Sequence, residues 1–284
     1  MDYDYEQIRR RCECDANKIK GKNVLGQKID EIERGNWDKL NYPEKDKIKI
    51  KEAIFGDNTS ISLTREQVFD ETKTETKTKI MKVLMWGYQK PFGTPNKAVF
   101  ESIANHLGYL ERMFKERFDA NNARNLNEDD IMTLFEDLKE VSGLGKKAIA
   151  TTSKLLYFFN VSFNGKRCLI YDSNVIRFLN HTDDKLTLCE DCYGEYLILN
   201  SNLKAKLKDF IRKAPWKATG DCYFEYLDLM DNLKTYLNID DPAKIEMYMF
   251  EEGKELAAEK KDKLKELKNK EKELKKNANL KDNS

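Results

Sequence analysis

Two helical patterns in this sequence meet at a short glycine turn, and this junction is the strongest constraint on the fold. The first pattern carries apolar residues at helical spacing: Ile131, Leu134, Phe135 and Leu138. It stops at Ser142-Gly-Leu-Gly145, and a second helical pattern begins at once and runs to Phe159. Because glycine permits positive φ and close backbone approach, the sequence predicts a tight helix–hairpin–helix.

Helix-breaking residues are scarce in the chain as a whole. Only five prolines and 13 glycines occur in 284 residues. This composition favours helices over a sandwich or a barrel, because those folds need many tight turns. We therefore expect a mostly α fold of two helical subdomains with an active-site cleft between them. Residues 1–60 and 161–250 would form one subdomain, and residues 61–160 would form a bundle that ends in the helix–hairpin–helix.

The composition changes near residue 251. Residues 251–284 contain eleven lysines and nine acidic residues, and no aromatic side chain. This pattern predicts a charged tail that is partly disordered or helical. Leu264, Leu267 and Leu274 form only a thin apolar stripe, so a partner-binding coiled coil is the alternative.

Composition also excludes several classes of protein. No stretch approaches the roughly 18 apolar residues of a membrane-spanning helix, and the acidic N-terminus lacks the apolar core of a secretory signal. We expect a cytoplasmic monomer, nucleoid-associated if bacterial, with no membrane partner. The formal net charge of +1 excludes a purely electrostatic nucleic-acid binder, although it permits a local basic face.

Metal-binding signals are weak. Cys189-Glu-Asp-Cys192 is the only Cys-x-x-Cys motif, and no second motif completes a four-cysteine zinc site. We therefore expect reduced thiols, no metal and no other cofactor. A zinc site that recruits Cys168 or Cys222 is the alternative.

The start of the second hairpin helix is suited to a phosphate group. Gly143 and Gly145 let the backbone come close, and the first N–H groups of a helix are unpaired at its positive dipole end. Lys146 adds positive charge at the same place. These residues are the predicted DNA contacts, while a tight αα-hairpin with no binding role would have a similar pattern.

A second motif follows this helix. Tyr171-Asp-Ser-Asn-Val-Ile-Arg177 places Asp172 at the start of another helix, where aspartate commonly serves as an N-cap. Together with Val141-Ser-Gly-Leu-Gly-Lys-Lys147, this segment resembles the helix–hairpin–helix DNA glycosylase superfamily, which contains endonuclease III and the 8-oxoguanine DNA glycosylases. The run 150–159 looks most like the bacterial branch with an 8-oxoguanine-glycosylase-type fold. The resemblance covers residues 138–179.

The resemblance implies base excision, with catalytic roles for Asp172 and Lys147. Asp172 would stabilise positive charge on the sugar and deprotonate the nucleophile. Lys147 matches the amine that forms a Schiff base in glycosylases with lyase activity, although it is equally suited to contact a phosphate. Lys154 is the alternative amine, and water would attack if neither lysine reaches the sugar.

The expected partner is double-stranded DNA with a flipped-out base, which needs aromatic or apolar walls. The candidate wall residues are Trp86, Tyr88, Tyr223 and Tyr226. Packing in the hydrophobic core is the alternative for each of them. The sequence does not specify the base.

Three hypotheses for function follow. The leading one is a DNA glycosylase, with or without lyase activity, that acts on damaged or modified bases. Since phage DNA contains modified bases, a role in antiviral defence is as open as base excision repair. The second hypothesis is a non-catalytic helix–hairpin–helix DNA-binding module in which Asp172 only caps a helix. The third is a helical interaction protein that acts through its charged tail.

Overall fold

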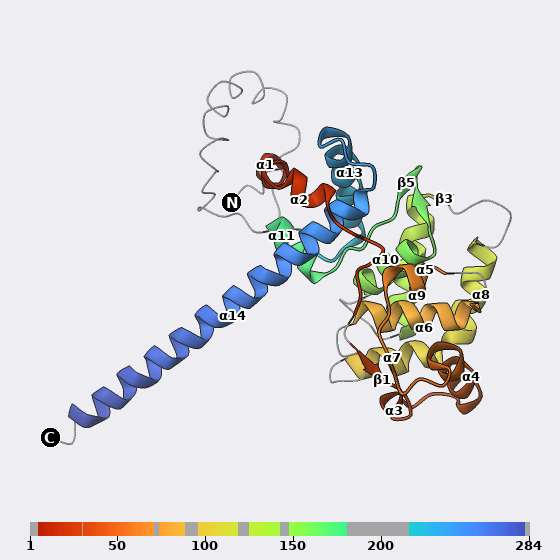
Figure 1. The fold of residues 1–284 in the computed structure, drawn as a ribbon, viewed down its shortest axis with the longest axis horizontal. Coiled ribbons are helices and arrows are strands. Elements are labelled where there is room, and N and C mark those ends of the chain that lie inside the picture. Colours follow the sequence, from red (N-terminus) through yellow and green to blue (C-terminus); the bar gives the residue numbers. More distant parts are fainter. Residues whose placement is uncertain are drawn as a thin grey trace. The chain divides into compact units, whose positions relative to one another are not determined.

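The computed structural model describes residues 5–29, 31–70, 74–88, 96–118, 125–142, 148–180 and 216–281. These residues are mostly helical, which confirms the predicted mostly α class, while the active-site cleft stays a prediction (Figure 1). The chain forms two compact units, which we name by size. The large unit comprises Asp15–Asp172 and Lys217–Glu246, and the small unit comprises Met1–Cys14, Ser173–Trp216 and Met247–Ser284. The subdomain boundaries predicted from the sequence stay a prediction.

Helices make up most of the large unit. They are α2 (Ala16–Lys20), α3 (Arg34–Trp37), α4 (Glu44–Phe55), α5 (Arg65–Phe69), α6 (Thr76–Gly87), α7 (Asn96–Asn105), α8 (Leu107–Phe118), α9 (Glu128–Ser142), α10 (Ala148–Phe158) and α13 (Gly220–Tyr236). Helix α10 packs against both α6 and α9. All of its residues except Ala150 are buried, so it lies in the centre of the core with no solvent-facing side.

Among the described residues, five two-residue strands accompany these helices. Strand β1 (Ile32–Glu33) pairs antiparallel with β2 (Ser60–Ile61). Strand β4 (Ser162–Phe163) pairs parallel with β3 (Asn125–Leu126) and antiparallel with β5 (Lys166–Arg167). We did not predict them, because two residues are too few to show the alternation that identifies a strand.

Asn164 and Gly165 form the turn between β4 and β5, as the Asn-Gly pair in the sequence predicts. Both residues have positive φ, 48° for Asn164 and 77° for Gly165. Positive φ at both central positions is the requirement of a two-residue type I′ hairpin. This hairpin leads the chain towards the segment that ends at Asp172.

A capping box opens α5, as the sequence Thr64-Arg-Glu-Gln67 predicts. The Thr64 hydroxyl accepts a hydrogen bond from the Gln67 backbone N–H, and the Gln67 side chain accepts one from the Thr64 N–H. The box fixes the first turn of α5 and places Arg65 at its first helical position. Arg65 is completely buried there.

Three helices form the described part of the small unit. They are α1 (Tyr5–Cys14), α11 (Ser173–Asn180) and α14 (Pro242–Lys281), whose first turn belongs to the large unit. The guanidinium of Arg11 lies 3.9 Å from the Phe178 ring centroid and donates a hydrogen bond to the Phe178 carbonyl. Phe178 packs edge-on against Tyr248. Thus α1 and α14 both contact α11.

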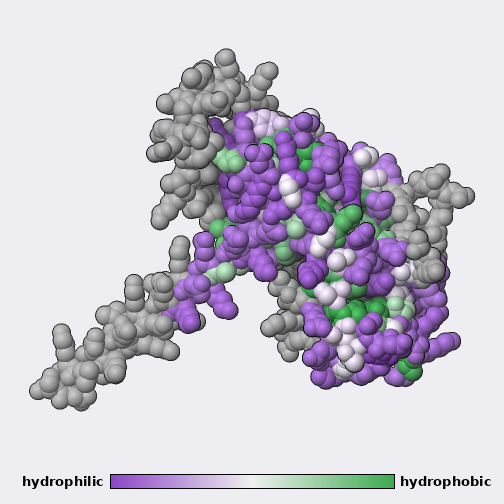
Figure 2. All heavy atoms as spheres, in the orientation of Figure 1, coloured by the Kyte–Doolittle hydropathy of each residue, from purple (hydrophilic) through white to green (hydrophobic). Residues whose placement is uncertain are grey.

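Hydrophilic residues cover most of the face drawn in Figure 2. Among the described helices, none combines the length and the apolar character that crossing a lipid bilayer requires. From residue 251, α14 continues as a helix to Lys281 in the segment for which we expected a charged tail.

The backbones of α14 and α11 come very close at Gly253. A Cβ atom at this position would lie 2.0 Å from the Asn174 carbonyl oxygen. We therefore expect Gly253→Ala to destabilise the small unit by about 1–3 kcal/mol, because a backbone atom cannot move aside as a flexible side chain can. Faster amide hydrogen exchange in α11 would report this loss.

Gly108→Ala in α8 is the matched control, because a Cβ there meets nothing within 4 Å. We expect that variant to keep or slightly raise the melting temperature, since alanine favours a helix over glycine. Equal exchange rates in both variants would contradict the close approach at Gly253.

Candidate functional site

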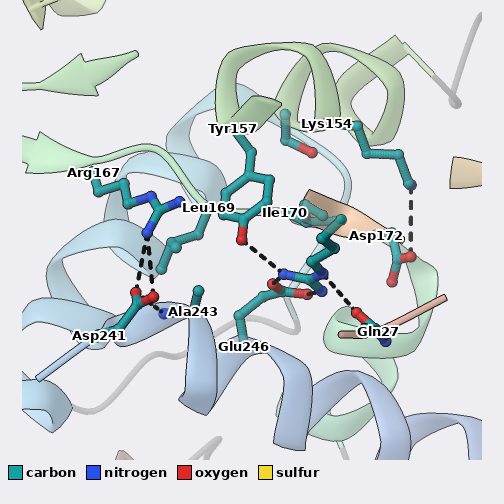
Figure 3. Close-up of polar contacts among 12 residues, drawn as sticks. Gln27, Lys154, Tyr157, Arg167, Leu169, Ile170, Asp172, Asp241, Ala243 and Glu246 are labelled. Atoms are coloured by element: carbon teal, nitrogen blue, oxygen red, sulfur yellow. Dashed lines mark hydrogen bonds and ion pairs between the residues drawn. The ribbon is translucent and has the colours of Figure 1, made fainter. Parts of the chain in front are cut away.

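A lysine and an aspartate face each other inside the large unit. The Nζ atom of Lys154 lies 3.6 Å from Oδ2 of Asp172 (Figure 3). The side chains are 5% and 13% exposed, respectively. A buried charge is costly unless it is paired, so each of these groups offsets the desolvation of the other.

The position of Lys154 follows from its helix and from a glycine. Lys154 projects from the middle of α10, and its stem passes the last residue of α6, Gly87. A Cβ atom at position 87 would lie 2.4 Å from Cδ of Lys154. The absence of a side chain at Gly87 therefore leaves room for the lysine stem. At the other end, Nζ donates a hydrogen bond to the Ala150 carbonyl at 3.4 Å.

Tyr88 lies beside the same ammonium group. Its ring centroid is 5.7 Å from Nζ of Lys154, and its hydroxyl is hydrogen-bonded to the Thr151 hydroxyl. Burial raises the pKa of Tyr88, and the negative charge of Asp172 raises it further, against the opposing effect of the Thr151 bond. Tyr88 is thus a neutral phenol that adds an aromatic face to the site.

The chain that leads to Asp172 is held by hydrogen bonds along its length. The Tyr223 hydroxyl donates to the Leu169 carbonyl at 3.2 Å, and the Tyr226 hydroxyl donates to the Ile170 carbonyl at 3.1 Å. In addition, the Tyr171 backbone N–H donates to the Ser153 hydroxyl of α10. Three consecutive residues before Asp172 are therefore fixed to α10 and α13.

Two of the predicted base-pocket residues, Tyr223 and Tyr226, thus support the backbone before Asp172. Both are completely buried, and burial raises their pKa values well above the usual range. A third, Trp86, is also buried, and its indole N–H donates to the Gln27 carbonyl. Tyr88 is only half-buried. The role of these four residues as walls of a base pocket stays a prediction.

An ion pair that the sequence did not reveal lies in the same region. Two guanidinium nitrogens of Arg65 contact the two carboxylate oxygens of Glu246 at 2.8 and 3.1 Å. Arg65 also donates to the Tyr157 hydroxyl and to the Gln27 side chain. Figure 3 shows Gln27, Tyr157 and Glu246 converging on the same side chain.

This pair is completely buried. Burial raises the pKa of Glu246, and the Arg65 guanidinium opposes that shift. The only sequence signal near Arg65 is the capping box, which indicates where the helix begins and not which residue the arginine contacts. Since 181 residues separate Arg65 from Glu246, no local pattern could identify the partner.

Several predicted site residues lie outside the described part of the chain. They are Gly143, Gly145, Lys146, Lys147, Cys189 and Cys192. Helix α9 ends at Ser142, α10 begins at Ala148, and the two helices pack against each other. The helix–hairpin–helix and its DNA contacts stay a prediction, as does the catalytic role of Lys147.

The described residues contain no group of three or more His, Cys, Asp or Glu side chains arranged to hold a metal ion. Cys168, one of the cysteines in the alternative zinc site, is buried, and burial raises the pKa of its thiol to about 12.

The chain matches the model of a known protein family. The model described as "Putative 8-oxoguanine DNA glycosylase OGG-like protein" matches residues 22–250. The chain belongs to this OGG-like family. The match includes both Lys154 and Asp172, and it extends far beyond residues 138–179, where the motifs lie. Neither the curated proteins nor the solved structures include a match to the chain.

The buried ion pair predicts a large effect of single substitutions on stability. We expect Arg65→Met to lower the free energy of unfolding by about 3–5 kcal/mol, because it leaves the Glu246 carboxylate buried without its partner. Denaturant unfolding measures this loss. The double variant Arg65→Met/Glu246→Met should recover part of it, since it removes both charges.

The control is the exposed Lys49–Glu75 pair, whose side chains are 64% and 56% exposed. Lys49→Met should leave the unfolding midpoint almost unchanged, because exposed ion pairs contribute little. Equal midpoints for Arg65→Met and Lys49→Met would show that the buried pair does not stabilise the large unit.

Proposed function

We propose that this protein excises a damaged or modified base from double-stranded DNA by flipping the base out and cleaving its N-glycosidic bond. One observation carries the proposal. In a chain that belongs to an OGG-like glycosylase family, the aspartate that matches the catalytic motif is largely buried, paired with a lysine and preceded by a firmly held backbone.

The chemistry requires a fixed negative charge beside the sugar. When the bond between C1′ and the base nitrogen breaks, its electron pair leaves with the base, and positive charge develops on the deoxyribose. The carboxylate of Asp172 would stabilise that charge. If water is the nucleophile, its oxygen bonds to C1′ and its proton passes to Asp172, which acts as the general base.

An amine is the alternative nucleophile. The Lys147 amine, after losing a proton to Asp172, would bond to C1′ as the base leaves with the electron pair of the N-glycosidic bond. Opening of the C1′–O4′ bond would then give a Schiff base, and elimination of the 3′ phosphate would nick the strand. Borohydride reduces such an intermediate to a stable covalent adduct. The presence of that adduct with wild-type protein, and its absence with Lys147→Ala, would establish the lyase step and its residue.

The substrate classes follow from the two biological roles. Repair requires an oxidised or otherwise damaged base, and antiviral defence requires a modified base in phage DNA. A parallel screen distinguishes the two roles. It digests oxidised duplex DNA and modified phage DNA and identifies the released bases by mass. We expect the enzyme to act as a cytoplasmic monomer, associated with the nucleoid if bacterial, and to need no cofactor.

Asp172→Asn tests the proposed catalytic role. We expect the single-turnover rate of base release to fall by about 10²–10⁴-fold, because the amide provides neither the negative charge nor the base. Asp46→Asn is the matched control, since Asp46 is another ion-paired aspartate of the large unit, 3.0 Å from Lys77. It should excise at the wild-type rate.

The same assay distinguishes a DNA-binding module from an enzyme. Salt-dependent binding of duplex DNA without release of any base would favour the non-catalytic module. Absence of both binding and excision would contradict every role in which DNA is the partner.

A further inference from the structure

We propose that Lys154 is a positioning residue that holds the Asp172 carboxylate for catalysis and is not the attacking amine. This inference rests on the proposed function, because it assigns a role within that site. It starts from the 3.6 Å contact between the Lys154 ammonium and the Asp172 carboxylate.

The exposed fractions of the two side chains differ, and this difference indicates different roles. Only 5% of the Lys154 side chain is exposed, compared with 13% of the Asp172 side chain. A nucleophile must reach C1′ of a sugar that enters from solvent. Asp172 is the more accessible member of the pair, so the lysine acts on the reaction through the aspartate.

The surroundings of Lys154 hold its ammonium in one place. The stem is confined by the α6 backbone at Gly87, where even a methyl group would overlap it. Nζ donates to the Ala150 carbonyl, and the Tyr88 ring lies to one side of it. These contacts fix the cation on a helix of which every residue except Ala150 is buried, and such support is more rigid than that of a surface lysine.

A fixed cation restricts a neighbouring carboxylate to one orientation, in which its negative charge can face an oxocarbenium-like sugar. Misplacing a catalytic group by about 1 Å costs about 10²-fold in rate. Lys154 thus fixes the orientation of the Asp172 carboxylate before DNA binds.

The test compares two substitutions of Lys154 in the full-length protein. The probes are a duplex with 8-oxoguanine opposite cytosine and duplex phage DNA that contains hydroxymethylcytosine. We expect Lys154→Met to lower the single-turnover excision rate by about 10²-fold on whichever probe the wild type cleaves, with duplex binding unchanged. Lys154→Arg should excise about tenfold faster than Lys154→Met, because it restores the positive charge.

The arginine variant separates the two roles of the lysine. A guanidinium keeps its proton and cannot form a Schiff base, so it can replace a positioning cation but not an attacking amine. An arginine variant no faster than the methionine variant overturns the inference. So does wild-type excision by Lys154→Met.

Two further variants control for stability and geometry. Lys79 is another buried lysine of the large unit, and its Nζ lies 4.8 Å from the Phe159 ring centroid. Lys79→Met should excise at the wild-type rate, and a loss equal to that of Lys154→Met assigns the effect to stability and overturns the inference. Gly87→Ala should slow excision, because it displaces the Lys154 stem without removing its charge.

The outcomes also distinguish this inference from the proposed function. If the wild type releases no base from either probe or from the broader DNA screen, the proposed function fails, and the role of Lys154 fails with it. If the wild type excises a base and Lys154→Met is equally fast, only the role of Lys154 fails.

Discussion

The large unit depends on the burial of α10, in which every residue except Ala150 is buried. A charged side chain on such a helix has little access to water. Lys154 therefore needs a partner within the protein, and Asp172 provides it. The same constraint explains why the residues before Asp172 are hydrogen-bonded to α10 and α13, since a mobile backbone would let the carboxylate move away from the ammonium.

Arg65 and Glu246 form a second buried ion pair in the same region as Lys154 and Asp172. This contact joins the first turn of α5 to the first turn of α14, and its guanidinium also contacts Tyr157 of α10. Buried ion pairs often add little stability compared with well-packed apolar residues, but removing one member is costly. The contribution of the pair is therefore measured by the cost of removing one member, which leaves a buried charge without its partner.

Much of the helical architecture could be predicted from the sequence, because the relevant signals are local. The capping box at Thr64 and the turn at Asn164-Gly165 both follow from residues within a few positions of each other. Contacts between distant segments could not be predicted. Both Lys154 and Asp172 were candidates, but their pairing depends on how α10 packs, which no short pattern encodes.

The role of Tyr223 and Tyr226 also depends on contacts that the sequence does not show. An aromatic residue at helical spacing can line a ligand pocket or fill a core, and its type is identical in both cases. Only the hydrogen bonds of Tyr223 and Tyr226 to successive main-chain carbonyls distinguish a supporting role from a free aromatic surface.

The missing side chain at Gly87 links this position to Lys154. Because a Cβ atom there would overlap Cδ of the lysine stem, a larger residue at position 87 requires the stem to move. The ammonium would move with the stem, so the precision with which the Asp172 carboxylate is held depends on a residue that carries no charge and no side chain.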